Sequence, residues 1–282
     1  MMKFDAPGLP ADWLNGWLAA VGAVALLPDV RLSWTNDVTP IARFHVGGDD
    51  FPERLFRAIQ SSGAFASLPS ATAPHNITAD EFERRARQSR RDTFLPALVT
   101  DLVRQPDEKL PRGEFNPPAQ RGITIFARYE RCRKQIASVD QIAATFEGQG
   151  SRAEGNGLGF DYRRLRAATY PGDPELFIEP VVECLCFAAM PLFPVRGSGA
   201  RRARTRGWLT VDGTQQRGFV WGSWSSALDC WGVDALLDIV HRRSADQREL
   251  RRWGLTSLFC SVRYERRGSS DVSTGYASRR LW

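Results

Sequence analysis

Arginines crowd one short segment of the chain. Residues 189–208 read AMPLFPVRGSGARRARTRGW, so an apolar run with two prolines gives way to five arginines without an acidic residue among them. A guanidinium group grips a phosphate through paired hydrogen bonds, and an indole ring stacks on a base. We therefore expect nucleic-acid contacts from Arg196, Arg201, Arg202, Arg204, Arg206 and Trp208. The alternatives are a solvated basic loop and a tryptophan that packs in the core.

A second basic segment covers residues 78–94, TADEFERRARQSRRDTF. Thr78 followed by Glu81 is the pattern of a capping box and predicts that a helix begins here. The candidate phosphate contacts on this helix are Arg84, Arg87 and Arg91. The alternative is a charged helix face that is turned to solvent.

Arginine dominates the basic residues of the whole chain. The chain has 38 basic and 32 acidic residues and a net charge of +6. Lysine occurs only at positions 3, 109 and 134, so all the other basic residues are arginine. A basic surface attracts nucleic acid whatever its base sequence. A GC-rich genome would also favour arginine codons, but it would raise the total and would not explain the local clusters.

Motifs for the common hydrolases and nucleotide-binding enzymes are missing. No lysine follows a glycine, which excludes the P-loop, and no G-x-S-x-G elbow is present. Residues 106–110, PDEKL, have the residue types of a carboxylate–lysine nuclease site, but they lie in a proline-rich loop. Residues 155–160, GNGLGF, are rich in glycine, but no predicted strand precedes them. We therefore expect no enzymatic activity and no cofactor.

The histidines and cysteines do not form a metal-binding motif. His45, His75 and His241 are far apart, and no H-E-x-x-H motif occurs. His241 follows a predicted helix, where its charged form would interact favourably with the helix dipole. The five cysteines include no C-x-x-C pair, and an odd number argues against a disulfide framework. We expect free thiols in a reducing cytoplasm and no bound metal.

The apolar segment 13–27 raises the question of a membrane helix. It has 15 residues, whereas a membrane-spanning helix needs roughly 20. A signal peptide is disfavoured because Asp5 and Asp12 outnumber Lys3 in the preceding segment, where positive charge is the rule. We therefore expect a buried helix, begun by Asp12 and ended by Pro28, and no membrane association.

Hydrophobic spacing and turn residues predict a fold of mixed elements. Helices are predicted over residues 12–27, 51–60, 78–94, 123–136 and 226–243. Strands are predicted over 31–34, 41–46 and 255–267, with a hairpin over 207–224, and 181–190 fits either a helix or a strand. The last fifteen residues are expected to form a polar tail. This order predicts an α+β fold of helices and antiparallel hairpins, with regions 1–104 and 105–282 or one continuous domain.

Several separated segments together resemble one family. These segments are LNGWLAAVGAVALL (14–27), RLSW (31–34), DTFLPALVTD (92–101), LGFDYRRLRAATYPGDPE (158–175), residues 189–208 and FVWGSWSSALDCWGVDALL (219–237). In this order they are similar to segments of large-subunit-type proteins from CRISPR systems of subtype I-G, formerly I-U. A related accessory protein of the same operon is the alternative.

The resemblance implies a non-enzymatic subunit of an RNA-guided complex that surveys DNA. Such a subunit would bind CRISPR RNA and target DNA, help to read the motif beside the target, and help to recruit a helicase-nuclease. Its other partners would be the remaining subunits of the complex. A purely architectural subunit is one alternative function, and an unrecognised nuclease is another.

Overall fold

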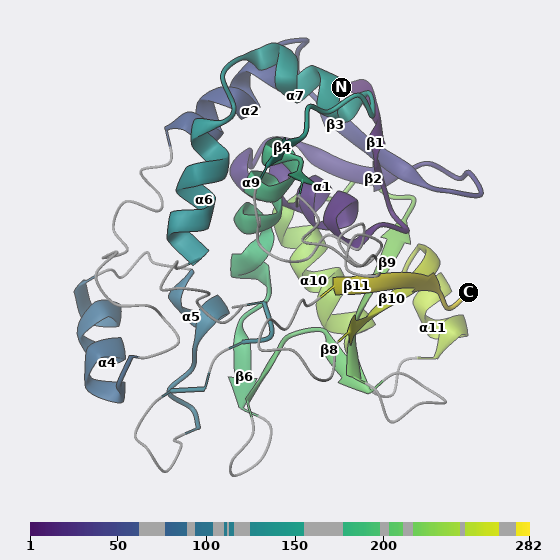
Figure 1. Cartoon of the computed structure of the whole chain (residues 1–282). Helices are drawn as coiled ribbons and strands as arrows, with labels where there is room; N and C mark the ends of the chain where they lie inside the picture. The colour runs from purple at the N-terminus through teal and green to yellow at the C-terminus, as the bar shows by residue number, and fades with distance from the viewer. Residues whose placement is uncertain are drawn as a thin grey trace, which may run out of the picture.

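The computed structural model of the chain has an α+β fold, as the sequence predicts (Figure 1). It describes residues 1–61, 77–88, 94–103, 110–111, 113–115, 125–154, 177–197, 203–210, 217–242, 246–264 and 275–282. Most of the predicted connector at 61–77 and of the proline-rich loop at 105–122 lies outside these ranges, as does the glycine-rich segment 155–160.

Helix α1 (Leu14–Leu26) packs tightly against helix α9 (Pro180–Ala189). Alanine and glycine leave little side chain between them, and a Cβ atom on Gly22 would lie 1.8 Å from the carbonyl oxygen of Leu185. The sequence fits either a helix or a strand over residues 181–190, and the structure has helix α9 there. The expected cap on α1 is wrong, because Trp13 occupies the N-cap position and no side chain caps the helix.

A three-stranded antiparallel sheet lies beside α1. Its strands are β1 (Met2–Pro10), β2 (Arg31–Trp34) and β3 (Ile41–Val46), in the order β1-β3-β2. The hairpin of β2 and β3 confirms the prediction, whereas β1 was not predicted. Helices α2 (Phe51–Gln60) and α7 (Val139–Phe146) pack together. Phe146 of α7 stacks on Phe44 of β3, and Phe51 of α2 contacts the same ring at a tilt of 47°.

A second antiparallel sheet is built from the C-terminal half of the chain. Its strands are β8 (Trp208–Thr210), β9 (Arg217–Trp224), β10 (Leu255–Tyr264) and β11 (Gly275–Arg280), in the order β11-β10-β9-β8. The predicted hairpin at 207–224 and the strand that begins at residue 255 are confirmed. The expected polar tail is wrong for residues 275–280, because these pair with β10 as strand β11.

Three tryptophan indoles join the two sheets and α1. Trp17 donates a hydrogen bond to the carbonyl of Gly222 at 2.9 Å, and Trp221 donates to the carbonyl of Ala11 at 2.7 Å. Trp224 donates to the carbonyl of Leu32 at 2.9 Å. A buried indole needs such a partner because an unpaired N–H is costly in an apolar core. Residues on both sides of position 104 therefore share one hydrophobic core.

The remaining elements surround this core. They are α4 (Ala79–Gln88), α5 (Leu95–Leu98), α6 (Ile125–Lys134), β4 (Ala153–Glu154), β5 (Phe177–Ile178), the 3-10 helix η2 (Met190–Leu192), β6 (Val195–Gly197), β7 (Ala203–Thr205), α10 (Cys230–Val240) and α11 (Gln247–Arg252). Helices α4, α6 and α10 confirm predictions, and α7 and α11 were not predicted. The predicted cap of α4 is present, since the Glu81 N–H donates to Thr78 Oγ1 at 3.3 Å.

Candidate nucleic-acid interface

The arginine-rich segment forms a short antiparallel hairpin of β6 and β7. In its register Val195 pairs with Thr205, and Arg196 pairs with Arg204. Strand β6 lies at the lower edge of the molecule in Figure 1, far below the three-stranded sheet and to one side of β8. The predicted contacts Arg201 and Arg202 fall between the two strands, outside the described residues.

Arg196 and Arg204 are direct cross-strand partners of like charge. Such pairs are unfavourable on an antiparallel ladder unless an anion lies near them. The side chain of Arg196 is 53% exposed, and its Nη2 lies 3.1 Å from Oδ1 of Asp238 on α10. One carboxylate therefore pairs with Arg196 from the body of the protein while Arg196 stays open to solvent, and Arg204 opposite it is half-buried. This geometry suits the binding of a phosphate from the outer side.

Arg206 does not belong to the exposed surface, so its prediction as a phosphate contact is wrong. Its side chain is only 3% exposed, and Nη2 lies 2.8 Å from Oδ1 of Asp238. Nη1 forms an ion pair with Asp234 and donates to the carbonyl of Leu192 at 3.0 Å. A buried charge is tolerated only with such partners. Arg206 therefore anchors the base of the hairpin to helix α10.

The Asp238 carboxylate holds two arginines at once. Partial burial raises its pKa, but the hydrogen bond from Arg196 and the positive charge of Arg206 lower it by more. Its pKa is therefore below that of a free aspartate. The carboxylate stays ionised at neutral pH and keeps both the exposed Arg196 and the buried Arg206 beside α10.

Trp208 is a core residue, so its prediction as a base-stacking platform is wrong. It is 4% exposed and meets Phe115 edge-on, with ring centroids 5.6 Å apart and planes at 89°. Gly207 before it has a φ of +87°, and a Cβ there would lie 2.6 Å from the ring of Phe219. Only glycine fits this turn. The chain therefore enters the core directly after Arg206.

His241 is the C-cap residue of helix α10, and its ring lies beside Gly207. Its Nε2 lies 2.8 Å from the carbonyl oxygen of Val220. A carbonyl only accepts, so Nε2 carries the proton, and the enclosed Nδ1 has no hydrogen-bond partner among the described residues. Burial, with a smaller contribution from Arg206, lowers the pKa of His241 to about 4. The expected interaction of a charged ring with the helix dipole is therefore wrong, because the ring is neutral at pH 7.

The arginines of helix α4 are paired with glutamates of the same helix. Arg84 Nη2 lies 2.6 Å from Glu81, and Arg87 forms an ion pair with Glu83. The hydrogen bond from Arg84 lowers the pKa of Glu81. Both arginines are exposed but have local carboxylate partners, and Arg91 lies outside the described residues. Figure 1 shows α4 well to the side of β6, so the two predicted surfaces are separate.

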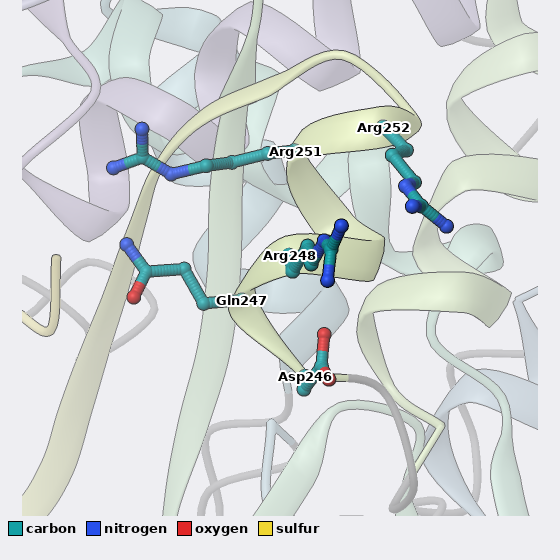
Figure 2. Close-up of a pocket in the computed structure, with 5 residues that line it drawn as sticks. All are labelled: Asp246, Gln247, Arg248, Arg251 and Arg252. Carbon is teal, nitrogen blue, oxygen red and sulfur yellow. The ribbon is translucent and has the colours of Figure 1, made fainter.

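A basic surface on helix α11 was missed by the sequence analysis. Arg248, Arg251 and Arg252 are exposed and line a shallow surface hollow with Asp246 and Gln247 (Figure 2). Asp246 caps the helix by accepting the Glu249 N–H at 2.7 Å. An aspartate followed three residues later by a glutamate is the sequence signal that would have located this helix.

The part of the chain that the structure describes holds no group of three or more histidine, cysteine or acidic side chains placed to bind a metal. The five cysteines are free thiols. Burial raises the pKa of Cys132 and Cys184, so these two thiols remain protonated at neutral pH. Within the described ranges no helix has the length and apolar character needed to span a membrane.

Comparison with known proteins was made at the level of families, of curated sequences and of solved structures. No family model, curated protein or solved structure matches the chain.

Proposed function

We propose that the chain is a non-catalytic subunit of a CRISPR-type, RNA-guided DNA-surveillance complex. In this role it contacts CRISPR RNA or target DNA, and it binds the other subunits of the complex. It helps to read the motif beside the target or to recruit a helicase-nuclease. The ordered resemblance of its sequence segments to subtype I-G large subunits supports this assignment, and so does the cross-strand pair of the exposed Arg196 and the half-buried Arg204.

The single observation that carries the proposal is the cross-strand pair of Arg196 and Arg204. The register places two arginines opposite each other on one narrow hairpin, and the exposed one of them, Arg196, brings positive charge to the surface. The buried Arg206 fixes the base of this hairpin, so the pair is held in place before a ligand arrives. Preorganised donors bind anions with less loss of conformational entropy.

Phosphate contacts of this kind position a nucleic acid but do not read its sequence. This fits an RNA-guided complex, in which base pairing to the guide reads most of the target. The hairpin would hold the backbone of the guide RNA or of the opened target. Arg201 and Arg202, which follow β6 in the sequence, add two further cations to the same segment.

The test is purification of the tagged chain from its native host, with and without nuclease treatment. We expect co-purification of neighbouring-gene subunits and of CRISPR RNA, and ultraviolet crosslinks from RNA or DNA to residues 195–205. The test variant replaces Arg196, Arg201, Arg202 and Arg204 with alanine and leaves the structural Arg206 intact. It should keep the protein partners and lose the crosslinks.

A charge-matched control removes four exposed cations elsewhere: Arg31, Arg57, Arg131 and Lys134. This control should retain the crosslinks of the wild-type chain. Absence of CRISPR RNA and of neighbouring subunits from the wild-type preparation would contradict the proposal. Equal loss of crosslinks in the control and the test variant would contradict the role of the hairpin.

A purely architectural subunit is the second candidate function, and exposed aromatic residues favour it. Trp231 on α10 is 82% exposed and Phe177 on β5 is 50% exposed. Aromatic residues are enriched at protein interfaces, where their burial stabilises a complex. Under this function Trp231→Ala would weaken subunit assembly, and no nucleic-acid crosslink would form at any residue of the chain.

A further inference from the structure

Helix α11 presents three arginines on a helix of only six residues. Figure 2 shows Arg251 and Arg252 extending to opposite sides of the helix, with Arg248 between them. Arg248 and Arg252 are four residues apart, so they are neighbours of like charge on one helix face. Such a pair destabilises a helix in the absence of a bound anion. The helix is nevertheless formed, because Asp246 caps it and Leu250 is buried against the core.

These arginines are available to a ligand. Arg248 and Arg252 make no hydrogen bond or ion pair with any residue that the structure describes. The one glutamate of the helix, Glu249, lies 3.7 Å from Arg242 and is therefore matched by another cation. This differs from helix α4, where the exposed arginines are paired with glutamates.

Two tryptophans accompany this helix: Trp253 comes next in the sequence, and Trp282 contacts Arg251. Trp253 follows the last residue of α11 and is 58% exposed. Its backbone is held at the end of the helix, because the backbone N–H of Trp253 donates to the Glu249 and Leu250 carbonyls at 3.2 and 3.1 Å. The guanidinium of Arg251 lies over the ring of Trp282, 5.2 Å from the centroid, and this cation–π contact orients Arg251.

We propose that the α11 surface, which comprises Arg248, Arg251, Arg252 and Trp253, is a binding site for single-stranded nucleic acid. The arginines bind successive phosphates, and an unpaired base stacks on the exposed ring of Trp253. A positively charged track beside an aromatic ring is the usual chemistry of single-strand binding. Stacking requires an unpaired base, so a duplex satisfies only the arginines.

A membrane surface would also attract arginine and tryptophan, but the helix does not suit it. A helix that lies in a bilayer interface needs a broad apolar face. The only apolar residue within α11 is Leu250, which is 3% exposed and packs in the core. Nucleic acid is therefore the ligand that uses all the exposed groups.

The inference deepens the proposed function, on which it rests for its biological setting. It adds a second nucleic-acid contact to the β6–β7 hairpin and names its ligand class. Its test uses the isolated chain with synthetic oligonucleotides and needs no other subunit. If the chain belonged to no CRISPR complex, oligonucleotide binding at α11 would persist, so the two proposals can fail separately.

The experiment measures fluorescence anisotropy of labelled oligothymidylate and oligouridylate of about 16 nucleotides, with a duplex of the same length for comparison. Replacement of Arg248, Arg251 and Arg252 by alanine should reduce the slope of log affinity against log salt by about 2 for single strands. The charge-matched variant Arg31→Ala, Arg57→Ala, Arg131→Ala should keep the wild-type slope. Circular dichroism shows whether each variant is folded.

Substitutions of Trp253 test the stacking contact separately. Trp253→Ala should weaken single-strand binding by roughly 5- to 150-fold, and Trp253→Phe should restore most of it. Both changes should leave binding to the duplex almost unaltered. The comparison of thymidylate with uridylate shows whether the strand is DNA or RNA.

Several outcomes would overturn the inference. These are equal slopes for the α11 and control variants, equal binding of Trp253→Ala and the wild type, and a Trp253→Leu variant that binds as well as Trp253→Phe. Tighter binding to anionic phospholipid vesicles than to oligonucleotides, lost in the same α11 variant, would assign the surface to a membrane instead.

Discussion

The buried Arg206 and the exposed Asp238 form an ion pair, with Nη2 of the arginine 2.8 Å from Oδ1 of the aspartate. The arginine side chain is 3% exposed, and the aspartate side chain is 57% exposed. The same carboxylate also reaches the exposed Arg196. The base of the β6–β7 hairpin is therefore tied to helix α10 by one arginine, while a second arginine of the hairpin remains at the surface.

The different roles of these two arginines predict different effects on stability. Arg206→Ala should lower the free energy of unfolding by about 3 kcal/mol, because it leaves Asp234 and Asp238 without their buried partner. Arg196→Ala should lower it by less than about 1 kcal/mol, since an exposed pair contributes little. Urea denaturation of the two variants measures both values. Equal losses would contradict the assignment of Arg206 as the anchor.

The depressed pKa of His241 predicts a loss of stability in mild acid. The unfolded ring binds a proton below its ordinary pKa of 6.5, whereas the folded ring stays neutral down to about pH 4. His241 therefore does not reduce the free energy of unfolding above pH 6.5. As the pH is lowered from 6.5 to 4, the free energy of unfolding falls by about 3 kcal/mol. Below pH 4 this contribution is constant.

The variant His241→Gln tests this pH dependence. Its amide N–H can still donate to the Val220 carbonyl, but it cannot titrate. The difference in unfolding free energy between wild type and variant should change between pH 6.5 and 4, when measured by urea denaturation. A difference that is constant over this range would show that His241 does not titrate as argued.

The core position of Trp208 predicts a structural effect. Trp208→Ala should lower the free energy of unfolding by about 3–5 kcal/mol, because it leaves a cavity beside Phe115 and Phe219. Trp208→Phe should cost less and should bind nucleic acid like the wild type. A stable Trp208→Ala variant with weakened nucleic-acid binding would instead favour a stacking role.

Close packing of α1 against α9 predicts that Gly22→Ala is strongly destabilising. In a solvent-exposed helix the replacement of glycine by alanine would stabilise the protein by up to about 1 kcal/mol. Here the new Cβ would lie 1.8 Å from the Leu185 carbonyl oxygen. The melting temperature should fall by several degrees or more. Gly47→Ala is the control, because nothing lies within 4 Å of its new Cβ. A Gly22→Ala variant that melts with the wild type would contradict this packing.

Much of the fold could be predicted from the sequence where residues repeat with a clear period. Helix α2 has the predicted bounds because Phe51, Leu55 and Ile59 form one buried face. Strands β2 and β3 also match. Strand β1 could not be predicted, because Met2–Pro10 mixes glycine, proline and charged residues and owes its strand form to pairing with β3.

The candidate site was predicted less well, for a physical reason. Composition located the arginine-rich segment as a basic loop, but it could show neither that a hairpin forms there nor which arginine turns inward. That choice depends on the Asp234 and Asp238 carboxylates of α10, which lie beside Arg206 only in the folded chain. Burial of Trp208 likewise depends on Phe115, which is distant in the sequence.

The salt dependence of nucleic-acid binding tests the role of the hairpin most directly. Affinity for a guide-length single strand should be measured over a range of salt concentrations for the wild type and for the variant that replaces Arg196, Arg201, Arg202 and Arg204 with alanine. If all four meet phosphates, the slope of log affinity against log salt should fall by about 3. Equal slopes for the two proteins would contradict a nucleic-acid contact at the hairpin.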